Sequence, residues 1–106
     1  MKYIITESRI NEILTQVIEH RYKGIEFKTG KWSVFGFLPH HSDSDWSLVY
    51  EKEDIPESDR MVLWIYFNDY QFFSVAVPLS DIEIKNTIKD WFYNKTGLKA
   101  DLVYIQ

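Results

Sequence analysis

Apolar residues in the first quarter of the chain recur at the three- and four-residue spacing of an amphipathic helix. The stripe consists of Ile10, Ile13, Leu14, Val17, Ile18 and Tyr22. Thr6 stands where an N-cap is expected and Gly24 where a helix commonly ends, so the pattern predicts a helix over residues 7–23. A short apolar run at 2–5 predicts a strand before this helix.

Runs rich in aromatic and β-branched residues follow the helix and are typical of strands. The glycine at position 30 predicts a tight turn between the first two runs. The pair Asn68-Asp69 predicts another turn, which would join two later runs into the clearest hairpin of the chain. The predicted strands cover residues 25–29, 31–38, 46–52, 60–67, 70–77 and 98–105.

A second helix is predicted between Ser80 and Gly97. Ser80 and Glu83 form a capping-box pattern, and the glycine closes the helix. Its apolar stripe consists of Ile84, Ile88, Trp91 and Phe92. The full order is then β-α-β-β-β-β-β-α-β over residues 1–106. It predicts a single α+β domain with a mainly antiparallel sheet of five to six strands and two helices on one face.

The predicted hairpin is apolar on both of its faces, which two helices cannot cover together. In the run 60–67, Leu63 and Ile65 alternate with Trp64 and Tyr66. The second face of the sheet must therefore curl on itself, lie beneath loops, or meet another chain. A second copy of this protein or a protein partner would serve equally well, because large exposed apolar surfaces are uncommon on monomers.

The charge of the chain is concentrated in its middle. The 106 residues carry a formal net charge of −4, and aromatic residues make up 17% of the chain. The segment 40–59 holds seven acids against one base, Lys52. Without a basic stripe, nucleic acid is not an expected partner. No apolar run is long enough to span a membrane and the chain lacks cysteine, so we expect a cytoplasmic protein.

One short segment has side chains that could hold a metal ion. Neutral imidazoles and carboxylates together bind zinc, manganese or iron. The candidate ligands are His40, His41, Asp43 and Asp45. The chain has no hydrolase elbow and no glycine-rich phosphate loop. We therefore expect no cofactor and no catalytic residue, and a metal-dependent enzyme using this loop is the third of three hypotheses.

The opening segment Lys2-Tyr3-Ile4-Ile5-Thr6-Glu7-Ser8-Arg9-Ile10 resembles the start of many short, uncharacterised proteins of tailed bacteriophages. Those proteins begin with a strand, the letters T-E-S and a helix. The resemblance covers about a tenth of the chain and implies a phage or prophage origin. It carries no activity and no site residues with it.

The leading hypothesis is a non-enzymatic protein–protein interaction protein, such as a phage accessory or virion component. Aromatic side chains are expected to form its contact patch and acids the charged rim. The patch residues are Trp64, Tyr66, Tyr70 and Phe72, and the rim residues are Glu51, Glu53, Asp54, Glu57 and Asp59. The alternative is a small acidic inhibitor or immunity protein that masks a basic site on a toxin or host enzyme.

Overall fold

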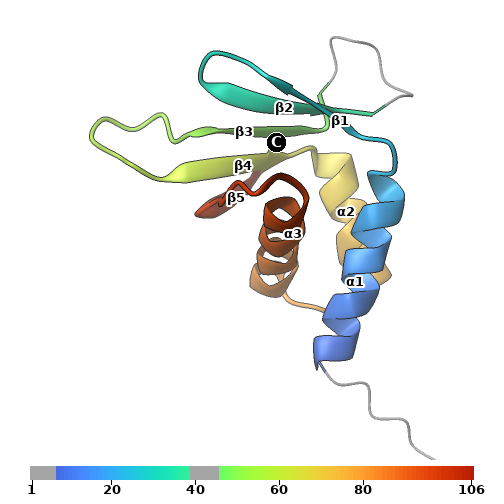
Figure 1. Ribbon diagram of the computed structural model, residues 1–106. Helices are drawn as coiled ribbons and strands as arrows, with labels where there is room; N and C mark the ends of the chain where they lie inside the picture. Colours follow the sequence, from blue (N-terminus) through green and yellow to red (C-terminus); the bar gives the residue numbers. More distant parts are fainter. Residues whose placement is uncertain (1–6, 39–45) are drawn as a thin grey trace, which may run out of the picture.

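The computed structural model describes residues 7–38 and 46–106 (Figure 1). Over these residues the chain forms one α+β domain with three helices and a five-stranded sheet, which confirms the expected fold class. The predicted strand at 2–5 lies outside the described residues. In chain order the elements are α1 (Glu7–Arg21), β1 (Glu26–Thr29), β2 (Ser33–Phe37), β3 (Leu48–Lys52), β4 (Met61–Ile65), α2 (Phe67–Ala76), α3 (Asp81–Thr96) and β5 (Leu102–Ile105).

The sheet has the strand order β1-β2-β3-β4-β5 and is mainly antiparallel, as the sequence predicts. The first four strands form a meander of antiparallel neighbours. The amide of Gly30 donates to the carbonyl of Ser33 at 2.7 Å in the predicted turn between β1 and β2. Strand β5 instead runs parallel to β4. A parallel neighbour requires a crossover connection, and α2 and α3 together provide it.

The prediction of a strand at 70–77 and of a hairpin around Asn68-Asp69 is wrong, because residues Phe67–Ala76 form helix α2. The structure accordingly has three helices in its described part, where two were predicted. Phe73 lies in the core and Tyr70, one helical turn earlier, packs against it from the same helix face. Val77, the C-cap of α2, is also in the core. Burial of this face outweighs the strand preference of its aromatic and β-branched residues.

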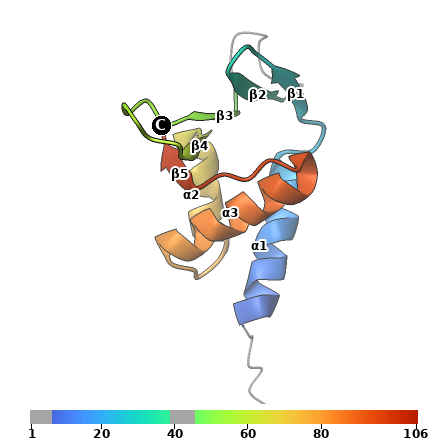
Figure 2. The ribbon, with the colours of Figure 1, turned by 60° about the vertical axis from the view of Figure 1, so that its left-hand side comes forward.

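All three helices pack on the same face of the sheet (Figures 1 and 2). The core lies between the helices and the sheet and contains side chains from all three helices and from β3, β4 and β5. Its fully buried members include Leu14, Ile18, Leu63, Ile65, Phe73, Ile84, Ile88 and Phe92. Helix α3 begins and ends as predicted. Ser80 accepts a hydrogen bond from the amide of Glu83, and Gly97 adopts the left-handed conformation at φ 75°.

The two glycines of the β1–β2 hairpin region differ in the space around them. A Cβ atom at Gly36 would lie 2.8 Å from Cδ1 of Ile25 and 3.2 Å from Cε1 of Phe27. A Cβ atom at Gly30 would meet nothing closer than 3.4 Å. Gly36 therefore allows the segment before β1 and β1 itself to pack closely over β2.

We expect Gly36→Ala to lower the free energy of unfolding by about 1–3 kcal/mol, because the added methyl overpacks a buried site. Gly30→Ala is the matched control and should change stability by less than about 0.5 kcal/mol. Urea denaturation followed by circular dichroism measures both. Equal stability of the two variants would contradict the close approach at Gly36.

Candidate functional site

The sheet presents a second face on which no described helix packs (Figure 1). Leu48, Leu63 and Val103 belong to the core beneath the helices. Successive residues of a strand point to opposite sides, so Val49, Trp64 and Tyr104 lie on the other face. This surface, the outer face, includes Phe35, Phe37, Val49, Glu51, Trp64 and Tyr104.

A line of mostly aromatic side chains crosses the outer face from one edge of the sheet to the other. The register pairs Lys28 with Phe35, Phe35 with Val49, Val49 with Trp64, and Trp64 with Tyr104. Directly opposed residues share a face, so these five side chains form one row. Val49 in the middle is only 4% exposed, whereas Tyr104 is 36% exposed.

Two aromatic pairs stand on either side of Val49. The rings of Trp64 and Tyr104 lie 5.2 Å apart between centroids, at an angle of 59°. Those of Phe35 and Phe37 lie 6.3 Å apart. The amine of Lys28 sits 5.1 Å from the ring centre of Phe37. The outer face therefore carries rigid rings of the kind that concentrate binding energy in protein interfaces.

An acidic pocket adjoins the Trp64–Tyr104 pair at the end of the sheet where β3 turns into β4. It has a volume of about 190 Å³. The lining residues are Glu51, Lys52, Glu53, Asp54, Ile55, Val62, Trp64 and Tyr104. The structure thus brings one predicted patch residue together with three predicted rim acids. Tyr104 and Ile55 are members that the sequence did not indicate.

Glu53 is buried on the outer-face side of this pocket, with 7% of its surface exposed. Its Oε1 atom accepts a hydrogen bond from a guanidinium nitrogen of Arg60 at 2.8 Å. Its Oε2 atom is buried and has no hydrogen-bond partner. A buried acceptor without a donor destabilises a folded protein by about 1–3 kcal/mol, so a hydrogen bond from a ligand to this atom would be favourable.

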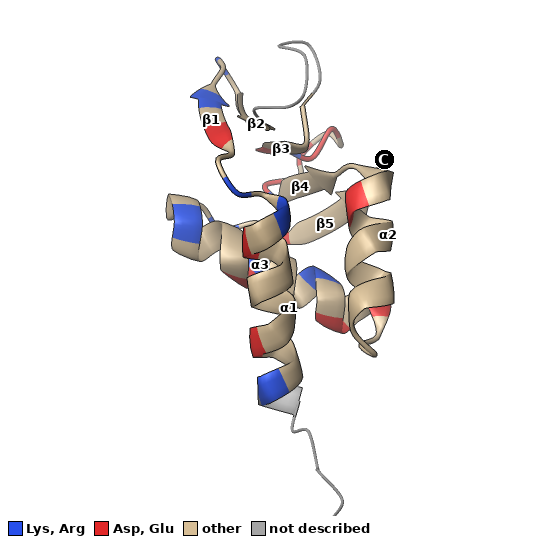
Figure 3. Ribbon diagram, turned by 90° about the vertical axis from the view of Figure 1, so that its right-hand side faces the viewer, with Lys and Arg blue, Asp and Glu red and all other residues tan. Residues whose placement is uncertain are grey.

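Three other rim acids, Asp54, Glu57 and Asp59, are exposed and lie on the β3–β4 connection, where Figure 3 shows red ribbon segments, while Glu51 in β3 is half-buried. Asp59 lies 3.8 Å from the amine of Lys52. Asp54 and Glu57 are both exposed, and Glu57 has a left-handed backbone with φ 68°. Within the part of the chain that the structure describes, Glu51, Asp54 and Glu57 form no ion pair.

The four aromatic residues of the predicted patch do not form one surface. Trp64 lies on the outer face, while Tyr66 is the N-cap of α2 and is 45% exposed. Phe72 lies on the solvent side of α2, where the guanidinium of Arg21 sits 4.8 Å from its ring centre. Phe72 lines an open groove of about 460 Å³ with Arg21, Asn68, Gln71, Val75 and Ala76. The helical geometry of 67–76 separates it from Trp64.

Tyr70 is packed against the core, and its hydroxyl donates a hydrogen bond to Asp81 at the start of α3. Burial and this hydrogen bond raise the pKa of Tyr70 to about 12. The same hydrogen bond, together with Lys85, lowers the pKa of Asp81. Tyr70 is therefore half-buried and connects α2 to α3.

The raised pKa of Tyr70 predicts a loss of stability at alkaline pH. An unfolded tyrosine ionises near pH 10, so the contribution is complete below that pH and is lost as the pH rises toward about 12. Urea denaturation from pH 8 to about pH 11 measures the slope. Tyr70→Phe should be less stable at pH 8 and show a flatter decline. An unchanged decline would exclude Tyr70 as its source and would point to Tyr22 and Tyr50, whose pKa values burial also raises.

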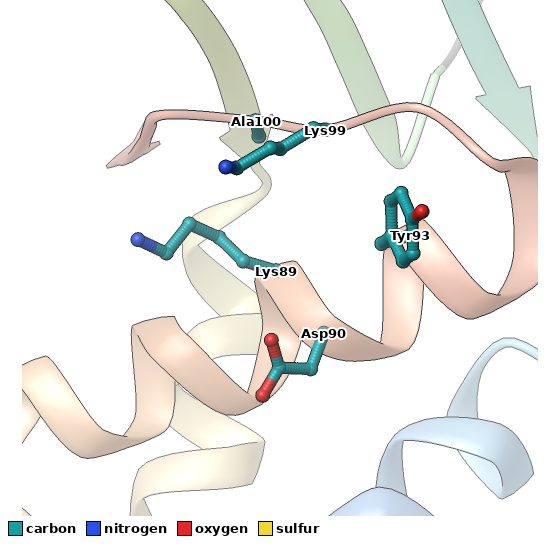
Figure 4. Close-up of a pocket in the computed structure, with 5 residues that line it drawn as sticks. All are labelled: Lys89, Asp90, Tyr93, Lys99 and Ala100. Atoms are coloured by element: carbon teal, nitrogen blue, oxygen red, sulfur yellow. The ribbon is translucent and has the colours of Figure 1, made fainter.

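A different concave region lies between α3 and the segment that leads into β5. Its volume is about 340 Å³, and it is lined by Lys89, Asp90, Tyr93, Lys99 and Ala100. In Figure 4 the amines of Lys89 and Lys99 extend the same way, while the carboxylate of Asp90 points away from them. The Lys89 amine lies 3.5 Å from the backbone oxygen of Asp101. These are solvated surface lysines, and no buried polar group faces them.

The candidate metal ligands His40, His41, Asp43 and Asp45 lie outside the described residues. Elsewhere, in residues 7–38 and 46–106, no group of three or more histidine, aspartate or glutamate side chains could hold a metal ion. The described chain also has no helix of the length and apolar character needed to cross a bilayer.

Comparisons with protein-family models, with curated proteins and with solved structures give no match. The similarity of the N-terminal segment to short phage proteins therefore stays a prediction.

Proposed function

We propose that this chain is a non-enzymatic interaction protein that binds a protein partner through the outer face. The observation that carries the proposal is the row of five side chains across the sheet, three of them aromatic, on the face opposite all three helices. Aromatic residues supply large contact area at low conformational cost and are enriched among binding hot spots.

The charge around this row favours a partner with a basic surface. Glu51 and Asp54 have no ion pair among the described residues, and Glu57 adds a further exposed carboxylate nearby in the chain. A rim of unpaired acids around an apolar centre attracts a partner of opposite charge and repels other acidic proteins.

The same charges disfavour a second copy of this chain as the occupant. Two such faces would meet about a two-fold axis. If the two-fold axis ran parallel to the strands through the middle of the row, the acidic β3–β4 connection of one copy would face that of the other. If the axis ran along the row, Lys28 of one copy would face Lys28 of the other. Each arrangement opposes like charges.

Differential capture tests this proposal. Immobilised wild-type protein, Trp64→Ala and the control Tyr93→Ala are exposed to the same extract of the cells that naturally contain the protein. Tyr93 is 53% exposed on α3, away from the outer face. We expect a basic protein that wild type and Tyr93→Ala retain equally and that Trp64→Ala loses. Equal retention by all three proteins, or a wild-type dimer in light scattering that Trp64→Ala dissociates, would overturn the proposal.

A second candidate function is inhibition of an enzyme or toxin whose active site is basic. The exposed carboxylates of Asp54 and Glu57 on the β3–β4 connection favour it, because an acidic loop can occupy a basic cleft. Asp54→Lys combined with Glu57→Lys should then slow association with the captured partner about tenfold or more at low salt. Stopped-flow measurement at several salt concentrations tests this, and an unchanged association rate would leave the acids as solubilising groups only.

A further inference from the structure

The acidic pocket beside Trp64 combines aromatic walls with a buried acceptor that has no hydrogen-bond partner among the described residues. We infer that it receives the guanidinium group of an arginine side chain on the partner. The inference rests on the proposed function and specifies the chemistry that the outer face recognises.

Trp64 and Tyr104 form the aromatic wall of the pocket. Their centroids are 5.2 Å apart, so the rings touch each other and leave no slot between them. A cation must therefore lie against the side of the pair that faces the pocket. Tryptophan attracts a cation most strongly of the aromatic side chains, and tyrosine also contributes.

The acceptor for the guanidinium is Oε2 of Glu53. This atom is buried and unpartnered, while Oε1 of the same carboxylate is held by Arg60. The existing ion pair fixes the orientation of the carboxylate, so its second oxygen is already positioned. Because Oε2 is buried, a donor reaches it only when the side chains that cover it move aside. Ile55, which also lines the pocket, is 52% exposed.

The negative charge of the pocket also favours an incoming cation. Arg60 compensates Glu53, and Lys52 lies near Asp59. Glu51 and Asp54 line the pocket without an ion pair in the described chain. One incoming positive charge would be held by carboxylates on two sides.

Arginine fits this arrangement better than lysine. Its planar group can stack on an aromatic ring while its several N–H donors reach separate acceptors. It is also more weakly hydrated than an ammonium group, so its transfer to a pocket partly closed by apolar Val62 costs less. A single guanidinium group can therefore contact the aromatic wall and the carboxylate acceptors at the same time.

The test uses the intact protein and capped single amino acids as probes. N-acetyl-arginine amide is titrated against the labelled protein, and the Trp64 indole N–H signal is followed by NMR after assignment with Trp64→Phe. We expect saturable binding with a Kd on the order of 1–10 mM. The lysine and neutral citrulline analogues should bind at least about fivefold more weakly.

Variants separate the pocket from a general attraction to acidic protein. Glu53→Gln and Tyr104→Ala should each weaken arginine binding about fivefold or more, whereas the surface control Asp90→Asn should leave it unchanged. Since Glu53→Gln also alters the contact with Arg60, Glu51→Gln provides an independent reduction of the pocket charge.

Equal binding of arginine and citrulline analogues, or no saturation, would overturn the inference. If that happens while Trp64→Ala still abolishes partner capture, the outer face remains the docking surface and only the arginine assignment fails. Arginine binding at the pocket together with partner capture that ignores Trp64→Ala would instead overturn the proposed function.

Discussion

Phe73→Ala is expected to lower the free energy of unfolding by about 3–5 kcal/mol. Phe73 is fully buried in α2 and meets the ring of Tyr22 edge-on at 5.6 Å. Tyr22 in turn packs 5.3 Å from Trp91 of α3. Removing the Phe73 ring leaves a cavity where all three helices meet, and the surrounding rings cannot collapse into it without losing their own contacts.

Val75→Ala in the same helix is the control, because Val75 is 81% exposed. It should change stability by less than about 0.5 kcal/mol. Urea denaturation followed by circular dichroism gives both values, with an unchanged slope as the check that the unfolded state is the same. In a strand, positions 73 and 75 would share a face and respond alike, so similar losses in the two variants would contradict the helix.

The contrast between α2 and α3 shows which parts of this fold are encoded locally. Helix α3 has its own start and stop signals in Ser80 and Gly97, and its apolar positions keep a helical period. In α2 the N-cap Tyr66 provides no side-chain cap hydrogen bond. Asn68 and Asp69 resemble a hairpin turn in sequence. Local signals therefore favour a strand, and only packing in the assembled core selects the helix.

The role of Asp69 illustrates why that selection cannot be read locally. Its carboxylate is buried, accepts a hydrogen bond from Nε of Arg21 at 2.9 Å and one from the Tyr22 hydroxyl at 3.2 Å. Arg21 is the last residue of α1 and Tyr22 directly follows it, and both lie more than forty residues away from Asp69 in the sequence. The position in the first turn of a helix also suits a negative charge. An acid that looks like a turn residue is thus a fixed link between two helices.

Only part of the candidate site was predictable, because some of its residues meet through contacts between distant parts of the chain. The sequence indicates Trp64 and the neighbouring acids, because strand alternation and charge are local properties. It does not indicate Tyr104 or Phe35, which join Trp64 only through strand register. The parallel pairing of β5 with β4 depends on α2 being part of the crossover, so the error in α2 also concealed Tyr104.

Trp64→Ala is expected to weaken partner binding by about 2–4 kcal/mol, roughly 30- to 700-fold in Kd. Trp64 occupies the row between Val49 and Tyr104 and also lines the acidic pocket, so its ring serves both the apolar centre and the charged rim of the outer face. Truncating it removes contact area and opens the centre of the interface to water, which weakens the neighbouring contacts as well. Calorimetry with the purified partner measures the change.

Two further variants make this result interpretable. Tyr104→Ser removes the neighbouring ring in β5 and should weaken binding in the same direction, although less, because Tyr104 is at the edge strand. Tyr93→Ala removes an exposed ring from α3 and should leave Kd within about twofold. Since Trp64 and Tyr104 touch, their double variant should lose less than the sum of the single losses. Strict additivity would show that the two rings contribute independently. A Kd unaffected by Trp64→Ala, in a protein whose circular dichroism is unchanged, would show that the partner binds elsewhere.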